Sequence, residues 1–375
     1  MHDARHAERQ LRSYWQWRVL IALMGCYLFY YTGRLVIGYA LPLIELDLGI
    51  SEEDQGKIVS ALLLAYGIGQ AINGNLGDWL GTRRMVALGA VGSAAMCWVF
   101  SFQSTLIGLT LAWAANGYVQ SLGWAPGSRL ISLWWPAHRR GLAFGLYMLA
   151  AGCSTVLVGA TSWLVLAALD ADDPARWRWL FRLPVLGLAL AGVLFYLFVR
   201  DKPEDVGLSP TDDELPDPSS DAGPRQKLDD PPPEDLVEHW TDRYLAVLGN
   251  VRFLAATLVI FFQSFARYGL LTWIPSYYTN AGIEIGDSIL ISMSLAVGMS
   301  VGAFAGGYLS DRLFFGRRTV GVAVFLGISG ACCLSLVLIP ISPGYGRAVG
   351  VVVLFLSGFF VYGAQGPLWA LCPEL

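Results

Sequence analysis

The stretch Gly74-Asn-Leu-Gly-Asp-Trp-Leu-Gly-Thr-Arg-Arg84 returns 233 residues later as Gly307-Tyr-Leu-Ser-Asp-Arg312, followed by Gly316-Arg-Arg318. The same register pairs three further positions outside the loop: Gly69 with Gly302, Pro42 with Pro275, and Arg34 with Arg267. Self-similarity at one fixed spacing is the signature of an internal repeat. The sequence therefore predicts two related halves.

The chain around these loops is strongly apolar. Of its 375 residues 55% are hydrophobic and 14% are charged, whereas soluble domains carry about 25% charged residues. A run of about 20 apolar residues spans a bilayer core. Ten such runs predict an all-α membrane protein with ten transmembrane helices, at about 19–44, 56–76, 84–103, 105–134, 141–168, 178–199, 251–280, 286–309, 319–340 and 346–370.

One segment is acidic rather than apolar. Residues 201–240 hold 13 of the 29 Asp and Glu but only 3 of the 25 Lys and Arg, so this stretch is net −10 and the rest of the chain net +6. Such a proline-rich, charged segment cannot bury enough apolar surface to fold. We therefore expect a tail at 1–18, a six-helix bundle at 19–200, an acidic mobile linker at 201–245, and a second bundle at 246–375.

The repeat also predicts where the second half stops. The partners of the spans within 141–199 would fall at about 374–432, beyond Leu375. We therefore expect the second bundle to hold only its first four helices.

The distribution of Lys and Arg predicts the orientation, because cytoplasmic loops carry the excess of these residues. The N-terminal tail and the loops at Arg83-Arg84, Arg139-Arg140 and Arg317-Arg318 fall on one side of the membrane. We therefore expect the N-terminus and the linker to lie in the cytoplasm. The expected location of the protein is the inner membrane of the cell. An exception near the outer face is the cluster Arg176, Arg178 and Arg182.

Several functional classes lack support in the sequence. Gly298-Met-Ser-Val-Gly302 has the spacing of a hydrolase nucleophile turn but lies inside an apolar span, where small residues serve close helix packing. The cysteines and histidines have no metal-ligand spacing, and no glycine-rich phosphate loop is present. Basic residues form no solvated stripe for nucleic acid. We expect no enzyme activity, no metal and no cofactor.

Two arginines lie deep inside apolar spans, at Arg34 and Arg267. Each costs about 2.5–3.5 kcal/mol at the centre of a membrane helix. They could snorkel to the interface or pair with an acid, but their own spans offer no acidic residue within reach. We favour a water-filled cavity in which both guanidiniums bind one dianion, such as phosphate, through paired N–H groups.

Tyrosines accompany the first arginine. Tyr27 and Tyr31 precede Arg34 by seven and three residues, so all three share one face of a continuous helix. These rings either line the cavity or form an aromatic packing stripe, which is common in membrane helices.

Four sequence blocks carry a family resemblance: Tyr30-Tyr-Thr-Gly-Arg34; Gln120-Ser-Leu-Gly-Trp124 with Pro126, Arg129 and Trp134-Trp135; Asp201-Lys-Pro203; and Arg267-Tyr-Gly269 with Trp273 and Pro275. From about residue 20 onward the chain resembles the organophosphate:phosphate antiporters of the major facilitator superfamily, proteins of two six-helix repeats. The resemblance implies a rocker-switch antiporter that exchanges inorganic phosphate for an organic phosphate, such as glycerol 3-phosphate or a hexose phosphate, and that works in the bilayer as a monomer.

The resemblance also implies roles for particular residues. Arg34 and Arg267 would hold the phosphate. Tyr27, Tyr31, Gln120, Trp124 and Tyr362 would line the cavity. The loops that contain Asp78 and Asp311 would latch the cytoplasmic side, together with Arg83, Arg84, Arg317 and Arg318.

The chain departs from the pattern at the accessory charged positions. Where the glycerol 3-phosphate transporter has Lys, Asp and a second Lys, this chain has Leu35, Thr272 and Gln70. An acidic position corresponds to Ala296 and a histidine to Ala151. The pair of arginines is thus kept while its charged neighbours are absent.

Two other functions fit the same sequence. One is a membrane receptor that binds a sugar phosphate and signals to a partner kinase without transport. The other is an inactive, truncated transporter.

Overall fold

The computed structural model describes residues 2–209, 249–314, 318–338, 345–365 and 368, and every regular element in these ranges is a helix. The N-terminal half holds α1 (His2–Tyr30), η1 (Tyr31–Gly33), α2 (Ile37–Leu48), α3 (Glu52–Leu80), α4 (Thr82–Ser101), α5 (Leu106–Gln120), α6 (Trp124–Trp134), α7 (Ala137–Ala167), η2 (Pro174–Arg176), α8 (Trp177–Leu180), α9 (Pro184–Phe198) and η3 (Pro203–Val206). The C-terminal half holds α11 (Val251–Asn280), α12 (Ile285–Phe314), α13 (Arg318–Leu338) and α14 (Tyr345–Gly363).

The all-α membrane class is confirmed. Within the described residues, seven helical segments are long and apolar enough to cross a membrane, and Arg347–Gly363 is a shorter apolar helix. The remaining predicted spans correspond to α3 and to the α5–α6 pair. The protein is therefore a multi-pass membrane protein.

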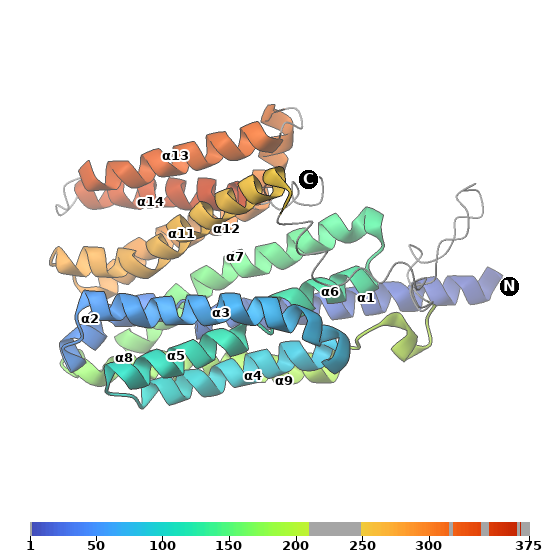
Figure 1. Ribbon diagram of the computed structural model, residues 1–375, viewed down its shortest axis with the longest axis horizontal. Coiled ribbons are helices and arrows are strands. Elements are labelled where there is room, and N and C mark those ends of the chain that lie inside the picture. Colours follow the sequence, from blue (N-terminus) through green and yellow to red (C-terminus); the bar gives the residue numbers. More distant parts are fainter. Residues whose placement is uncertain (1, 210–248, 315–317, 339–344, 366–367, 369–375) are drawn as a thin grey trace.

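Three of the predicted spans are not continuous helices. The run at 19–44 is divided into α1, η1 and α2. The run at 105–134 is divided into α5 and α6 by residues 121–123, and the run at 178–199 into α8 and α9 by residues 181–183. The apolar pattern alone predicts one helix for each of these runs, because it contains no information about hydrogen bonds from neighbouring helices. All three interruptions lie in the N-terminal half (Figure 1).

Equivalent helices of the two halves pack in the same way. Helix α3 packs on α5, and its repeat partner α12 packs on α14. Gly69 and Gly302 lie at these contacts: a Cβ on Gly69 would collide with the Ser121 side chain, and one on Gly302 with the Phe359 carbonyl. Small residues thus allow close helix approach, as expected for Gly302 from the sequence.

The two halves touch at the end of the bundle that carries Glu52 and Asn280, which we call the closed end. There the Asn280 side-chain amide donates to Glu52 Oε1 at 2.6 Å. A Cβ on Gly38 of α2 would lie 2.8 Å from the Leu271 carbonyl oxygen of α11. Helices α7 and α12 also pack between the halves. The contact between the halves thus combines a side-chain hydrogen bond with close helix approach at Gly38.

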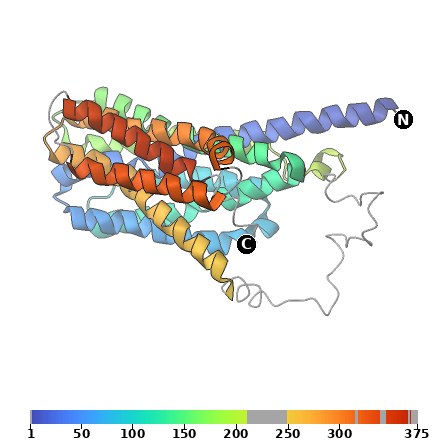
Figure 2. The ribbon, with the colours of Figure 1, turned by 90° about the horizontal axis from the view of Figure 1, so that it is seen from above.

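The opposite end of the bundle, which carries Ser209 and Val251, is called the linker end. The first turns of α11, in yellow in Figure 1, lie away from α3, whereas the last turns of α11 lie beside α2. Figure 2 shows the same helix running obliquely, with its start on the side of the N-terminus. Val251, the first residue of α11, is 77% exposed. At the linker end the start of α11 is therefore set apart from α3.

The arginine cluster that breaks the charge rule has a structural role. Arg178 donates to the carbonyls of Ser101 and Gln103 at 2.8 and 2.9 Å, just where α4 ends, and it lies 3.5 Å from Asp47. Arg182 donates to the Ser101 hydroxyl at 2.9 Å. Cations near a helix C-terminus interact favourably with its unpaired carbonyls. Arg178 and Arg182 therefore cap the C-terminal end of α4.

The segment predicted to be a mobile linker from residue 201 is held against the bundle as far as Ser209. The Asp201 carboxylate accepts a hydrogen bond of 2.7 Å from the backbone N–H of Arg83, in the first turn of α4. Arg12 donates to the Ser209 carbonyl at 2.9 Å. Residues 210–248, the rest of the predicted linker, lie outside the described residues.

Candidate functional site

A cavity of about 1000 Å³ lies between the two halves. Among the described residues that line it, only Arg34 and Arg267 carry a formal charge, and none is Asp, Glu, Lys or His. The walls are mainly aromatic, aliphatic and hydroxyl side chains: Tyr27, Tyr31, Arg34, Gly56, Val59, Ser60, Leu63, Tyr66, Gln70, Trp124, Met148, Ala151, Ile260, Phe261, Ser264, Phe265, Arg267, Tyr268, Gly269, Thr272, Trp273, Tyr362 and Gln365.

Arg34 belongs to the interruption between α1 and α2. Its backbone N–H bonds to the Tyr31 carbonyl at 3.0 Å, and its φ of −127° lies outside the helical range. The side chain is 4% exposed, and its Nε has no hydrogen-bond partner within the described structure. An arginine with a free donor inside the protein is suited to bind an anion.

Arg267 reaches the same cavity from the opposite wall. It belongs to α11, which is uninterrupted from Val251 to Asn280, and it is 9% exposed. Its Nε also lacks a partner. Neither this arginine nor Arg34 forms an ion pair with any residue that the structure describes. The salt-bridge alternative for the two arginines therefore finds no support here.

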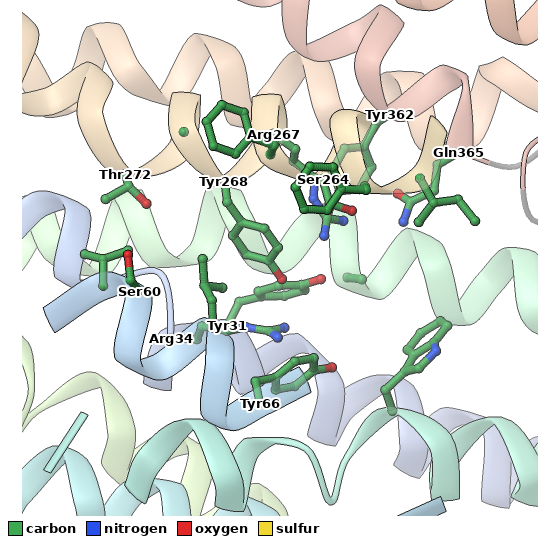
Figure 3. A pocket seen from close by; sticks show the side chains of 18 of the residues that line it. Tyr31, Arg34, Ser60, Tyr66, Ser264, Arg267, Tyr268, Thr272, Tyr362 and Gln365 are labelled. Carbon is green, nitrogen blue, oxygen red and sulfur yellow. The ribbon is translucent and has the colours of Figure 1, made fainter. Parts of the chain in front are cut away.

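Tyrosine rings surround both guanidiniums (Figure 3). The Arg34 guanidinium carbon lies 4.5 Å from the Tyr31 ring centroid and 4.8 Å from that of Tyr66. The Arg267 guanidinium carbon lies 5.6 Å from the Tyr362 centroid. These distances are within the range of cation–π attraction. Aromatic faces thus stabilise both cations without neutralising them.

Tyr27 and Trp124 line the cavity as the resemblance implies, and they also pack on each other. Their ring centroids are 5.8 Å apart. Trp124 stacks on Tyr147 of α7 at 5.0 Å with an interplanar angle of 6°. Both interpretations of these aromatic residues therefore apply: the rings pack on one another, and the edge of the packed cluster forms part of the cavity wall.

Gln120 is placed differently from the expectation. It does not line the cavity, is 1% exposed, and donates from Nε2 to the Tyr30 carbonyl at 3.0 Å and to the Ser93 hydroxyl at 2.7 Å. The cause is the break at the end of α1, which leaves a carbonyl turned toward α5. Gln120 therefore contacts the backbone behind the wall.

The predicted cytoplasmic latch is largely outside the described residues. This applies to Arg317 and to the side chains of Asp78, Asp311 and Arg318. Arg83 donates from Nε to the Tyr196 carbonyl at 2.5 Å and lies over the Tyr196 ring at 4.1 Å, and Arg84 is exposed. The latch stays a prediction.

Sequence reasoning missed several lining residues, above all Tyr66 and Tyr268. Gln70 donates to the Tyr66 hydroxyl at 2.8 Å; the two are four residues apart on α3, which could have marked a polar face. Tyr268 directly follows Arg267, within a block already noted for its resemblance. Gln365 follows α14 and had no sequence signal that we can identify.

Three positions that depart from the family pattern line this cavity: Gln70, Ala151 and Thr272. Because these three side chains are uncharged, the two arginines carry the only formal charges among the described lining residues. Within the described residues no cluster of three or more His, Cys, Asp or Glu could hold a metal ion.

Two repeated helical halves around a central cavity within the membrane define the fold of a secondary transporter. Residues 23–375 match the model of the Major Facilitator Superfamily, and the chain belongs to this family. Among solved structures, the partially occluded inward-open xylose transporter XylE from E. coli shares the fold, with a TM-score of 0.72, 16% identity, and coverage of 96% of this chain and 85% of that one.

Curated relatives match nearly the whole chain. The probable hexose phosphate transport protein of Chlamydia pneumoniae is 25% identical, over 97% of this chain and 79% of its own length. The glycerol-3-phosphate transporter of Bacillus subtilis is 26% identical, over 92% and 76%. The membrane sensor protein UhpC of Salmonella typhimurium is 25% identical, over 94% and 76%.

Proposed function

We propose that the protein exchanges an organic phosphate for inorganic phosphate by alternating access, with the cavity as its binding site. The observation that carries this proposal is the pair of buried arginines, one from each half, in a cavity whose described lining residues include no Asp or Glu. Relatives named for hexose phosphate and glycerol 3-phosphate transport support a phosphorylated sugar or polyol as the organic substrate.

The mechanism follows from the charges. A dianion between Arg34 and Arg267 accepts N–H bonds from both guanidiniums and offsets their repulsion, so it draws the halves together. The empty cavity holds two like charges and resists closure. A ligand shifts a conformational equilibrium only through its differential affinity for the two states, and here the closed state gains the second arginine. Exchange, rather than net flux, is the consequence.

The direction of opening supports an assignment of the two faces. The halves touch at the closed end, through Glu52 and Asn280, whereas at the linker end the first turns of α11 lie away from α3. We assign the linker end, with the N-terminus, to the cytoplasm of a cell whose inner membrane contains the protein, because the basic loops gather there. The structure then corresponds to an inward-open state of a transporter monomer.

Counterflow in proteoliposomes tests the proposal. Vesicles loaded with phosphate should take up labelled phosphate, glycerol 3-phosphate or glucose 6-phosphate from outside. Arg34→Lys keeps the charge but loses the paired N–H geometry, and we expect exchange to fall at least about tenfold, the effect of one charge-assisted hydrogen bond. Arg252→Lys, at an exposed position of α11, should leave exchange unchanged.

Two results would contradict parts of this proposal. Exchange that is unaffected by Arg34→Lys would exclude the bidentate clamp. Phosphate binding by the wild-type protein without any exchange would favour a sensor, the role for which the Salmonella relative is named.

A further inference from the structure

The interruption beside Arg34 leaves backbone carbonyls inside the protein without their usual helical partners. In a continuous helix the N–H of Arg34 would bond to the carbonyl four residues earlier, that of Tyr30. Here it bonds to the Tyr31 carbonyl. Tyr30 is 1% exposed, so water does not replace the lost bond. Unpaired backbone groups at membrane depth are strongly unfavourable, and another donor is required.

Helix α5 supplies the donors, from two side chains one turn apart. Gln120 donates to the Tyr30 carbonyl at 3.0 Å. Asn116 donates to the Gly33 carbonyl at 2.7 Å. These two carbonyls belong to the last residue of α1 and to the residue directly before Arg34. The backbone is therefore held on the N-terminal side of the arginine.

A third side chain joins the two donors. Ser93 of α4 donates to Asn116 Oδ1 at 2.7 Å and accepts from Gln120 Nε2 at 2.7 Å. Ser93, Asn116 and Gln120 are all at most 1% exposed. Hydrogen bonds in such a dry network strengthen one another and fix a single geometry.

Gly33 is the residue that lets this network reach the backbone. A Cβ at this position would lie 2.5 Å from Ser93 Oγ and 2.8 Å from Gln120 Nε2. Any side chain would push the network away. Glycine here serves close approach, since only the four glycines at 49, 81, 207 and 282 have a positive φ among those described.

The second arginine has no comparable arrangement. Arg267 belongs to an uninterrupted helix, and the side chain one turn earlier, Gln263, donates to the Val361 carbonyl of α14 at 3.1 Å. The backbone around Arg267 is held by its own helix, whereas that around Arg34 depends on α4 and α5.

We propose that Asn116 and Gln120 are positioning residues for anion binding: they fix the backbone at the α1–α2 interruption and thereby aim the Arg34 guanidinium into the cavity without touching the ligand. The proposal rests on the proposed role of Arg34 as an anion ligand. It assigns to Gln120 a role different from the cavity wall.

The test compares Asn116→Leu and Gln120→Met with a matched control, Asn73→Leu. Asn73 is also buried and also donates from α3 to a side chain beside α5, Ser121 Oγ at 2.6 Å, but it does not contact the interruption. The full-length protein in nanodiscs is titrated with inorganic phosphate, and its thermal unfolding is recorded. We expect phosphate affinity to fall about tenfold for each test variant, the effect of one lost hydrogen bond, and less than twofold for Asn73→Leu.

A double-mutant cycle separates positioning from general destabilisation. Residues that act through one another are non-additive, whereas independent ones add. Gln120→Met should weaken phosphate binding about tenfold in an Arg267→Lys background but by less than about twofold in an Arg34→Lys background. Equal effects in the two backgrounds, or an equal loss in Asn73→Leu, would overturn the proposal. If instead the wild-type protein binds no phosphate, the proposed function fails and not only the positioning.

Discussion

Arg34 and Arg267 share one aromatic ring: their guanidinium carbons lie 5.9 and 4.5 Å from the centroid of Tyr268. The two cations are therefore separated by no more than the sum of these distances, although they are 233 positions apart in the chain. Like charges so close, in a cavity whose described lining includes no Asp or Glu, favour an anion between them.

Replacing the shared ring should weaken anion binding. Tyr268→Leu removes an attractive face from both arginines and frees them to move apart, and we expect phosphate affinity to fall about tenfold, since a desolvated cation–π contact contributes up to about 2 kcal/mol. Tyr268→Phe keeps the ring and should lie within about threefold of wild type. Titration with phosphate measures both variants. Equal losses in Phe and Leu variants would show that the hydroxyl matters, not the ring.

Gly38 should control the contact between the two halves at the closed end. A Cβ there would lie 2.8 Å from the Leu271 carbonyl and 3.0 Å from that of Thr272, so Gly38→Val should force α2 from α11 and favour an outward-open state. Spin labels at Glu53 and Ala281, both exposed, report the separation in a cysteine-free background. The distance should increase. Gly25→Val, with nothing within 4 Å of its Cβ, should leave it unchanged; a shift in both variants would contradict this role.

Asp201 should stabilise the N-terminal half. Its carboxylate accepts from the first turn of α4, through the Arg83 N–H, in the manner of a capping residue. Asp201→Ala should lower the free energy of unfolding by about 1 kcal/mol, the usual effect of losing such a cap. Thermal unfolding in detergent measures it. Glu204→Ala, at an exposed position nearby, is the control, and equal melting temperatures for the two variants would argue against capping.

The repeat register was the most informative signal in the sequence. It paired Gly69 with Gly302, which lie at equivalent helix contacts, and Arg34 with Arg267, which line one cavity. This constant spacing of 233 residues can be detected in the sequence because the two halves keep small residues at the positions where helices approach closely. The apolar runs likewise located the membrane segments, since a bilayer sets their length.

The sequence did not reveal where those segments break. The end of α1 at Tyr30 and the break after Gln120 depend on hydrogen bonds between helices, for example from Gln120 to the Tyr30 carbonyl. Local propensity does not contain such contacts. The family resemblance implied that Gln120 lines the cavity, and it did not reveal this hydrogen bond to the backbone. Tyr66 was overlooked because tyrosine is ordinary in membrane helices.

No Asp or Glu is among the described residues that line the cavity, and this has a consequence for the choice between phosphate and other oxyanions. Hydrogen phosphate carries an acidic hydroxyl, whereas sulfate is a dianion without one, and a carboxylate acceptor would bind the first and repel the second. Guanidinium groups only donate hydrogen bonds, so two of them bind any dianion of suitable size and do not distinguish hydrogen phosphate from sulfate. Discrimination against sulfate then has to come from the hydroxyl groups of the wall and from the carbon skeleton attached to the phosphoryl group.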